Sequence, residues 1–164
     1  MAYSQEKFNL SQLITSTINI ELPAAKHKEL TLTVDFDNNI PPVLIGDDYR
    51  LQRILINLLS NAIKFTHKGS VKLVVEQSVR ENNNLIILKF IVEDTGIGIP
   101  IEKQNFIYEK FARISPSNKG IYEGAGLGLS IVKQFIEEME GEIDLESEID
   151  KGSKFICTIP LNCL

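Results

Sequence analysis

The chain of 164 residues contains little cysteine and has no apolar run long enough to cross a membrane. Its two cysteines, Cys157 and Cys163, match no metal-ligand or redox spacing, which favours reduced thiols in a cytoplasmic protein. No apolar run reaches the roughly 18 residues that a membrane span requires, and residues 1–5 do not resemble a signal peptide. We therefore expect a cytoplasmic chain without direct membrane contact, and any inner-membrane anchor of a parent protein would lie outside residues 1–164.

Basic residues are also fewer than acidic ones. The net charge is −5, which argues against a non-specific nucleic-acid binder, since such proteins are usually basic. An anionic nucleotide is not excluded, because a local cluster of Lys or Arg decides its binding. Hydrophobic residues make up 43% and charged residues 24%, as in one globular domain with a buried core.

The hydrophobic pattern predicts a single domain that mixes helices and strands. Apolar periodicity and breakers predict helices at 8–25, 48–65 and 126–140, and a short helical stretch at 100–109. Alternating or continuous apolar runs predict strands at 30–36, 71–79, 85–92, 143–147 and 154–159. The sum is an α+β two-layer sandwich in which three helices cover one face of a mixed, roughly five-stranded sheet. We expect residues 1–164 to form one domain with a core of about 8–161.

Three polar side chains line up on the second predicted helix. Spacings of four and three residues align Asn57, Asn61 and Lys64 opposite the apolar side of this helix. A plain solvated helix face would explain the stripe. However, Asn costs several tenths of a kcal/mol against Ala inside a helix. A carbonyl oxygen of Asn is a suitable ligand for Mg²⁺, and Lys is a suitable phosphate partner, so a metal–phosphate site is the alternative.

A second motif, Asp94-Thr-Gly96-Ile-Gly98-Ile99, follows the apolar run 85–92. An Asx turn, in which the Asp side chain caps its own backbone, would account for it. Alternatively, a carboxylate at a strand end accepts a hydrogen bond from a ligand, and the two glycines let the backbone pass close to that ligand.

A third motif, Gly124-Ala-Gly126-Leu127-Gly128-Leu129, opens the last predicted helix. Glycines spaced by two residues free backbone amides to bind an anion at a helix start. The motif fits neither the P-loop nor the Rossmann spacing. A glycine-rich hinge that permits close helix packing remains the structural alternative.

Together and in this order, the three motifs resemble the N, G1 and G2 boxes of the ATP-binding domain of sensor histidine kinases. This domain has the Bergerat fold that is shared with gyrase B, Hsp90 and MutL. The resemblance implies that Asn61 holds Mg²⁺, Lys64 contacts phosphate and Asp94 reads adenine, which favours ATP over GTP. It implies a lid and phosphate cradle from the third motif. The remaining ATP-binding residues that it implies are Phe65, Gly96, Gly98, Ile99 and Tyr108.

Two further positions carry roles in the same resemblance. Asn57 stands where the related ATPases have a glutamate base, and its amide cannot take a proton from water. This favours phosphoryl transfer over hydrolysis. The segment 106–113 resembles the F box, with Tyr108 in place of the usual Phe, and Arg113 stands where a lid arginine lies near the terminal phosphate. Core aromatics that anchor a helix would explain this segment equally well.

The chain offers no phosphoacceptor histidine. His27 and His67 lack the acidic neighbour and the following proline of the acceptor motif. The resemblance therefore implies a protein histidine kinase catalytic domain, monomeric in isolation and unable to autophosphorylate without its acceptor domain. Its expected partners are the helical dimerisation and phosphoacceptor domain of the same kinase and, through it, a response regulator. A nucleotide-gated interaction module without catalysis, an ATPase of the gyrase type and an anti-sigma type serine kinase are the alternatives.

Overall fold

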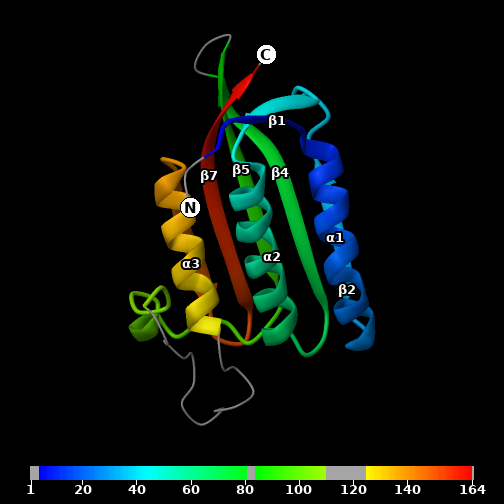
Figure 1. Ribbon diagram of the computed structural model, residues 1–164. Coiled ribbons are helices and arrows are strands. Elements are labelled where there is room, and N and C mark those ends of the chain that lie inside the picture. Colours follow the sequence, from blue (N-terminus) through cyan, green and yellow to red (C-terminus); the bar gives the residue numbers. More distant parts are fainter. Residues whose placement is uncertain (1–3, 81–83, 110–124, 164) are drawn as a thin grey trace.

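The computed structural model describes residues 4–80, 84–109 and 125–163 and shows a two-layer α+β sandwich (Figure 1). Within these ranges the helices are α1 (Leu10–His27), α2 (Asp48–Phe65) and α3 (Ala125–Glu138), with a 3₁₀ turn at Ile101–Lys103. The strands are β1 (Glu6–Asn9), β2 (Thr31–Phe36), β3 (Val43–Gly46), β4 (Ser70–Arg80), β5 (Leu85–Asp94), β6 (Glu142–Glu148) and β7 (Gly152–Cys163). None of the helices in this part of the chain is both long and apolar enough to span a bilayer.

The strands form one mixed sheet of order β1-β3-β7-β5-β4-β2. Strand β7 pairs along its length with β5, and its other edge is shared by β6 and β3. Most neighbours are antiparallel, whereas β2 joins β4 in parallel because α2 and β3 lie between them in the sequence. The helices α1, α2 and α3 all cover the same face of this sheet (Figure 1).

The central strand β5 shows how the sheet builds the core. Its side chains alternate between buried and half-buried over all ten residues. Ile86, Leu88, Phe90 and Val92 are fully buried beneath the helices. Asp94 ends the same row, because side chains two residues apart point to the same face. The alternation therefore directs this carboxylate into the helix-covered layer.

Helix α2 lies at the centre of the helical layer. The Asp47 side chain caps its first turn by accepting a hydrogen bond from the Arg50 amide at 2.9 Å. At its other end, the Lys28 ammonium donates to the carbonyls of Ile63 at 2.6 Å and Lys64 at 3.1 Å. These bonds satisfy carbonyls that the helix leaves open, and the positive charge suits a helix C-terminus.

The expected sandwich with three helices on one face is confirmed. The sheet has two more strands than the roughly five expected, since β1 and β3 are four residues each and too short to show alternation. The helical stretch expected at 100–109 is wrong beyond its first turn: only Ile101–Lys103 forms a 3₁₀ turn, and the chain continues in turns. Residues 113–123, between the F-box segment and the third motif, lie outside the described residues.

Candidate functional site

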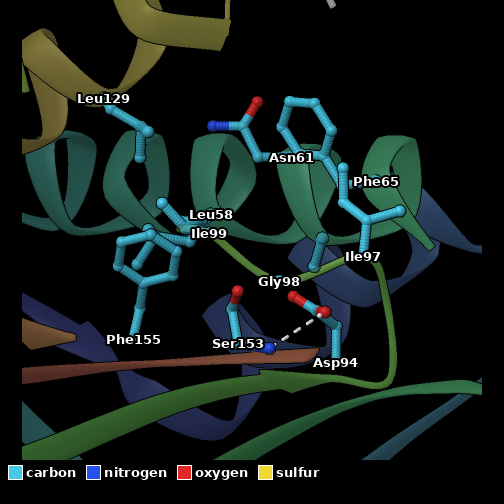
Figure 2. Close-up of a pocket in the computed structure, with 11 residues that line it drawn as sticks. Leu58, Asn61, Phe65, Asp94, Ile97, Gly98, Ile99, Leu129, Ser153 and Phe155 are labelled. Carbon is cyan, nitrogen blue, oxygen red and sulfur yellow. Dashed lines mark hydrogen bonds between the residues drawn. The ribbon is translucent and has the colours of Figure 1, made fainter. Parts of the chain in front are cut away.

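A pocket opens where α2, the segment after β5, the start of β7 and α3 meet (Figure 2). It encloses about 370 Å³, including its open mouth. Its walls are mainly apolar, with one carboxylate and one amide among them. The lining residues are Leu58, Asn61, Ala62, Phe65, Asp94, Ile97, Gly98, Ile99, Leu129, Ser153 and Phe155. An apolar cleft with few converging polar groups is typical of a site for a small ligand.

The two oxygens of Asp94 have different surroundings. Oδ1 accepts hydrogen bonds from the amides of Gly96 at 2.8 Å and Ser153 at 3.3 Å. The bond to Gly96 is the Asx turn that the motif alone could explain. Figure 2 shows the second oxygen directed toward the pocket, and no described residue donates to it. The structural and the ligand-binding interpretations of this residue are therefore compatible, one for each oxygen.

Burial also changes the acidity of this carboxyl. Asp94 is only 8% exposed, and loss of solvation raises its pKa, with a further increase from Glu93. The amides of Gly96 and Ser153 act in the opposite direction but do not cancel the effect. A partly desolvated carboxylate with one open oxygen is a strong acceptor for a donor group of a ligand.

Two glycines let the segment after β5 run close to other backbone. A Cβ on Gly96 would overlap the Phe65 carbonyl, and one on Gly98, whose φ is +73°, would overlap the Glu148 carbonyl. The amide of Ile97 donates to the Phe65 carbonyl at 3.1 Å, which fixes this segment against the end of α2. Only glycine fits at these two positions, so the segment that lines the pocket lies directly against the end of α2 and the end of β6.

The polar stripe of α2 is covered rather than solvated. Asn61 is 8% exposed and Asn57 is half-buried, and the side-chain nitrogens of both are buried without a hydrogen-bond partner. Helix α3 supplies the cover: a Cβ on Gly128 would lie 3.9 Å from Asn61 Nδ2 and 4.0 Å from Asn57 Cγ. Buried amides are normally paired, and leaving one unpaired costs about 1–3 kcal/mol. This pair therefore indicates a place where a polar ligand is expected.

The structure brings together six of the residues that the sequence predicts for the site. Those that line the pocket are Asn61, Phe65, Asp94, Gly98, Ile99 and Leu129. Asn57, Gly96 and Gly128 lie next to it, through the contacts given above. Lys64 is half-buried one turn beyond Asn61 and does not line the pocket. Arg113 and Gly124 lie outside the described residues, as does the side chain of Leu127, and Gly126 lies in the first turn of α3.

Tyr108 lies against α3 instead of lining the pocket. The Lys133 ammonium is 5.3 Å from the centre of its ring. The hydroxyl is buried without a hydrogen-bond partner, and burial raises its pKa. This position matches the role of a core aromatic that anchors a helix.

Five lining residues were not predicted from the sequence. Leu58 and Ala62 are neighbours of Asn61 on α2, so the helical repeat could have indicated them. Ser153 and Phe155 reach the site only because Asp94 pairs with Ser153 in the register of β5 and β7. No local pattern reveals a pairing across 59 residues. Ile97 lies inside the Asp94 motif itself.

Comparisons with known proteins agree with this geometry. The family described as histidine kinase-, DNA gyrase B-, and HSP90-like ATPase matches residues 46–162. The circadian input-output histidine kinase CikA of Synechococcus elongatus is 43% identical over 155 residues, which are 93% of this chain and 20% of that protein. The hybrid signal transduction histidine kinase A of Dictyostelium discoideum is 39% identical over 159 residues, or 93% of this chain and 7% of that protein. The chain thus spans a fifth or less of these curated relatives.

Solved structures show the same fold. Full-length ShkA in complex with AMPPNP has a TM-score of 0.83 at 27% identity, covering 100% of this chain and 32% of that one. The catalytic domain of the histidine kinase ThkA has a TM-score of 0.72 at 26% identity, covering 98% of this chain and 96% of that one. The second match extends over nearly the whole of both chains.

Proposed function

Because this chain belongs to the histidine kinase-, DNA gyrase B- and HSP90-like ATPase family, we propose that it is the ATP-binding catalytic domain of a two-component histidine kinase. The observation that carries the proposal is the pocket in which the open oxygen of Asp94 lies among apolar walls, beside the unpartnered amide of Asn61. The similar structure of ShkA is a complex with the nucleotide analogue AMPPNP, which supports a nucleotide as the ligand here. Residues 8–161 would form this domain.

The pocket suits adenine better than guanine. The exocyclic amino group of adenine donates to a carboxylate, whereas guanine has a carbonyl oxygen at that position, which would repel it. The apolar walls, which include Ile97, Ile99 and Phe155, would pack against the planar ring. Asp94 therefore selects ATP over GTP in this proposal.

The stripe on α2 suits a hydrated Mg²⁺ and the phosphates. No cluster of three acidic, His or Cys side chains is found within the described ranges, so a fully protein-bound metal is not indicated there. A Mg²⁺ ion that binds phosphates and waters needs only one or two protein oxygens. Asn61 would supply one through Oδ1, while its buried, unpartnered Nδ2 would be free to donate to a phosphate oxygen. When bound, Mg²⁺ neutralises charge on the phosphates; Lys64, Arg113 and the glycines of the third motif would hold the phosphate oxygens.

Asn57 favours transfer to a protein over hydrolysis. An amide cannot accept a proton from water, so this residue would not serve as the base that activates water. A histidine nitrogen of a separate dimerisation and phosphoacceptor domain would form the new N–P bond while the bond between the γ-phosphorus and the ADP oxygen breaks. A response regulator would then receive the phosphoryl group from that histidine. In this proposal the domain is cytoplasmic and monomeric on its own.

Calorimetry on an Asp94→Asn variant tests nucleotide recognition. Asn keeps an oxygen for the amides of Gly96 and Ser153 but can turn an NH₂ donor toward adenine. We expect ATP affinity to fall about 10- to 100-fold, as for the loss of a charged hydrogen bond. The control is Glu93→Gln, the same change one residue earlier, where the side chain pairs with Lys154 at 3.8 Å on the other face of β5. Unchanged affinity in Asp94→Asn would contradict the proposal.

A mixing experiment separates the alternatives for the reaction. The domain is incubated with γ-labelled ATP, with and without a separate acceptor hairpin of a related kinase. We expect acid-labile phosphohistidine on the hairpin only, and none on His27 or His67. Tight ATP binding without any transfer would favour a nucleotide-gated interaction module. Rapid phosphate release would favour an ATPase, and acid-stable phosphoserine would favour a serine kinase.

A further inference from the structure

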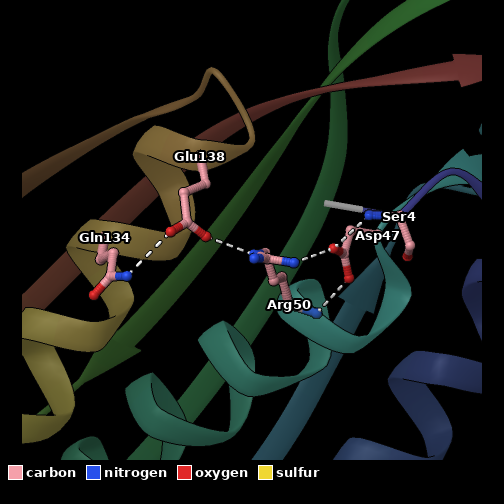
Figure 3. A network of polar contacts seen from close by, with 5 residues as sticks. All are labelled: Ser4, Asp47, Arg50, Gln134 and Glu138. Carbon is pink, nitrogen blue, oxygen red and sulfur yellow. Dashed lines mark hydrogen bonds and ion pairs between the residues drawn. The ribbon is translucent and has the colours of Figure 1, made fainter. Parts of the chain in front are cut away.

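A chain of ion pairs around the buried guanidinium of Arg50 joins the start of α2 to the exposed end of α3 (Figure 3). Arg50, only 3% exposed, donates from Nη1 to Asp47 Oδ2 at 2.6 Å and from Nε to Glu138 Oε2 at 2.6 Å. The second oxygen of Glu138 accepts from Gln134 Nε2 at 3.0 Å. The guanidinium also lies 5.3 Å from the centre of the Phe135 ring. Both helices therefore hold the same guanidinium group.

The groups in this chain are charged and mutually dependent. The hydrogen bond to Glu138 is the largest of the effects that raise the pKa of Arg50. Hydrogen bonds from Gln134 and then Arg50 lower the pKa of Glu138. The pair between Arg50 and Glu138 is a weak source of net stability, because Arg50 loses solvation when it is buried and Glu138 remains 35% exposed. The best-attested role of such charged contacts is to select one alignment of the elements that they join.

The alignment matters because the far ends of the same helices meet at the candidate site. Gly128, in the first turn of α3, lies against Asn57 and Asn61 near the end of α2. From Arg50 to Asn61 the chain rises roughly 16 Å, and from Gly128 to Glu138 roughly 15 Å, at 1.5 Å per residue. The two spans are nearly equal. The contacts at both ends of the two antiparallel helices can therefore form together in one register. Sliding α3 by one residue would move Gly128 by about 1.5 Å.

We propose that Arg50 and Glu138 are positioning residues that set the register of α3 against α2, and with it the place of the first turn of α3 over the Asn57–Asn61 pair. The link to ATP rests on the proposed function. The Ser4 amide donates to Asp47 Oδ2 at 3.0 Å, so the backbone that enters β1 contacts the same network. The network thereby joins the entry of the domain to a site about 16 Å away along α2.

The test uses Glu138→Gln, which keeps size and hydrogen-bonding capacity but removes the charge that Arg50 requires. The matched control is Glu137→Gln, the adjacent residue, whose exposed side chain pairs with Lys133 at 3.7 Å. Amide hydrogen exchange of residues 129–132 is measured without nucleotide, and affinities for ATP–Mg²⁺ and adenosine are measured by calorimetry. For Glu138→Gln we expect faster exchange at 129–132 and about a tenfold loss of ATP affinity, with a much smaller change for adenosine. Glu137→Gln should match the wild type in each measurement.

Loss of stability alone would lower both ligand affinities together, so the ratio of ATP to adenosine affinity is the decisive quantity. An unchanged ratio, or exchange that increases only near residues 134–138, would overturn the proposal. If the wild type binds no ATP, the proposed function is wrong. The hydrogen-exchange measurement still shows whether Glu138 sets the register of α3 against α2. If Glu138→Gln does not fold, the same measurements are made on Arg50→Lys, with Arg53→Lys as its control. One ammonium cannot replace both guanidinium contacts, so the same pattern is expected at smaller amplitude.

Discussion

At the residue scale, Asp94 combines a structural role with the binding role that we propose for it. One oxygen closes the turn after β5 and tethers β7 through Ser153, and the other faces the pocket. The second role lowers the stability of the fold, because a charged carboxylate is held where solvation is poor. Sites that hold a ligand commonly carry such a local loss of stability.

This cost can be measured as a dependence of stability on pH. The unfolded carboxyl loses its proton near its ordinary pKa of 3.8, and the folded one only at higher pH. The contribution of Asp94 to the free energy of unfolding is therefore fully present below the unfolded pKa and is lost as pH rises through the folded pKa. Asparagine has no such titration. We expect the melting temperature of Asp94→Asn, relative to wild type, to increase between pH 3 and pH 7. A difference that is constant with pH would contradict the burial argument.

At the element scale, Gly98 and Gly128 both lie near the site, but for different structural reasons. Gly98 has φ of +73° and lies against the backbone of Glu148 and Ile149, so a methyl group there has no room. Gly128 lies in α3, where a methyl group would make ordinary contacts with the Asn57–Asn61 pair at 3.9–4.0 Å. The first glycine is needed for the fold, and the second leaves space beside two amides.

Alanine at each position should separate stability from binding. Gly98→Ala should lower the free energy of unfolding by about 2 kcal/mol or more, from left-handed strain and a backbone clash. Gly128→Ala should keep or raise the melting temperature, since Ala favours a helix over Gly by up to about 1 kcal/mol. It should nevertheless weaken ATP binding several-fold, because the methyl group narrows the space over the amides. Thermal melts and calorimetry on both variants check this; a strongly destabilised Gly128→Ala would contradict it.

The same elements show how far the sequence alone predicts the structure. Helix α2 is predicted nearly to the residue, because its apolar stripe and its Asp47 cap are local signals. The burial of the polar face of α2 cannot be predicted from the sequence of that helix. Asn61 is buried because α3, far along the chain, packs over it. Glu138, the partner of Arg50 on α3, is 88 residues away, and Ser153 enters the site through the register of β7. Local patterns therefore predict the motif residues, whereas the residues that surround and orient them depend on tertiary pairing.

At the scale of the whole molecule, the described helices all cover one face of the sheet, and none of them lies on the other face (Figure 1). On the uncovered face, cross-strand neighbours alternate in charge across four strands. Lys72 pairs with Glu93, Glu93 with Lys154, and Lys154 with Glu146. Opposite charges on directly paired residues are each worth about 0.2–1 kcal/mol, and like charges are unfavourable by a similar amount. The row thus stabilises β6 at the edge of β7.

Reversing one charge in this row tests its contribution. Lys154→Glu would place three carboxylates side by side, at 93, 154 and 146. We expect the free energy of unfolding to fall by about 1 kcal/mol, from two repulsive pairs in place of two attractive ones. Raising the salt concentration to about 1 M should remove most of the difference, because the charges are on the surface. Denaturant unfolding at low and high salt measures both; Lys68→Glu, in the exposed segment between α2 and β4, is the control. A loss that salt does not reduce would indicate packing instead of charge.

The alternation of β5 also governs which changes of chain length the domain tolerates. Asp94 faces the pocket because it is an even number of residues from Phe90 and Leu88 in one unbroken strand. Deleting or inserting one residue between Leu88 and Asp94 would turn the carboxylate toward the uncovered face of the sheet. It would also bring side chains of the uncovered face into the buried row. A change of two residues would restore the facing but shift the pairing with Ser153. Among relatives, the number of residues from Leu88 to Asp94 should therefore stay constant.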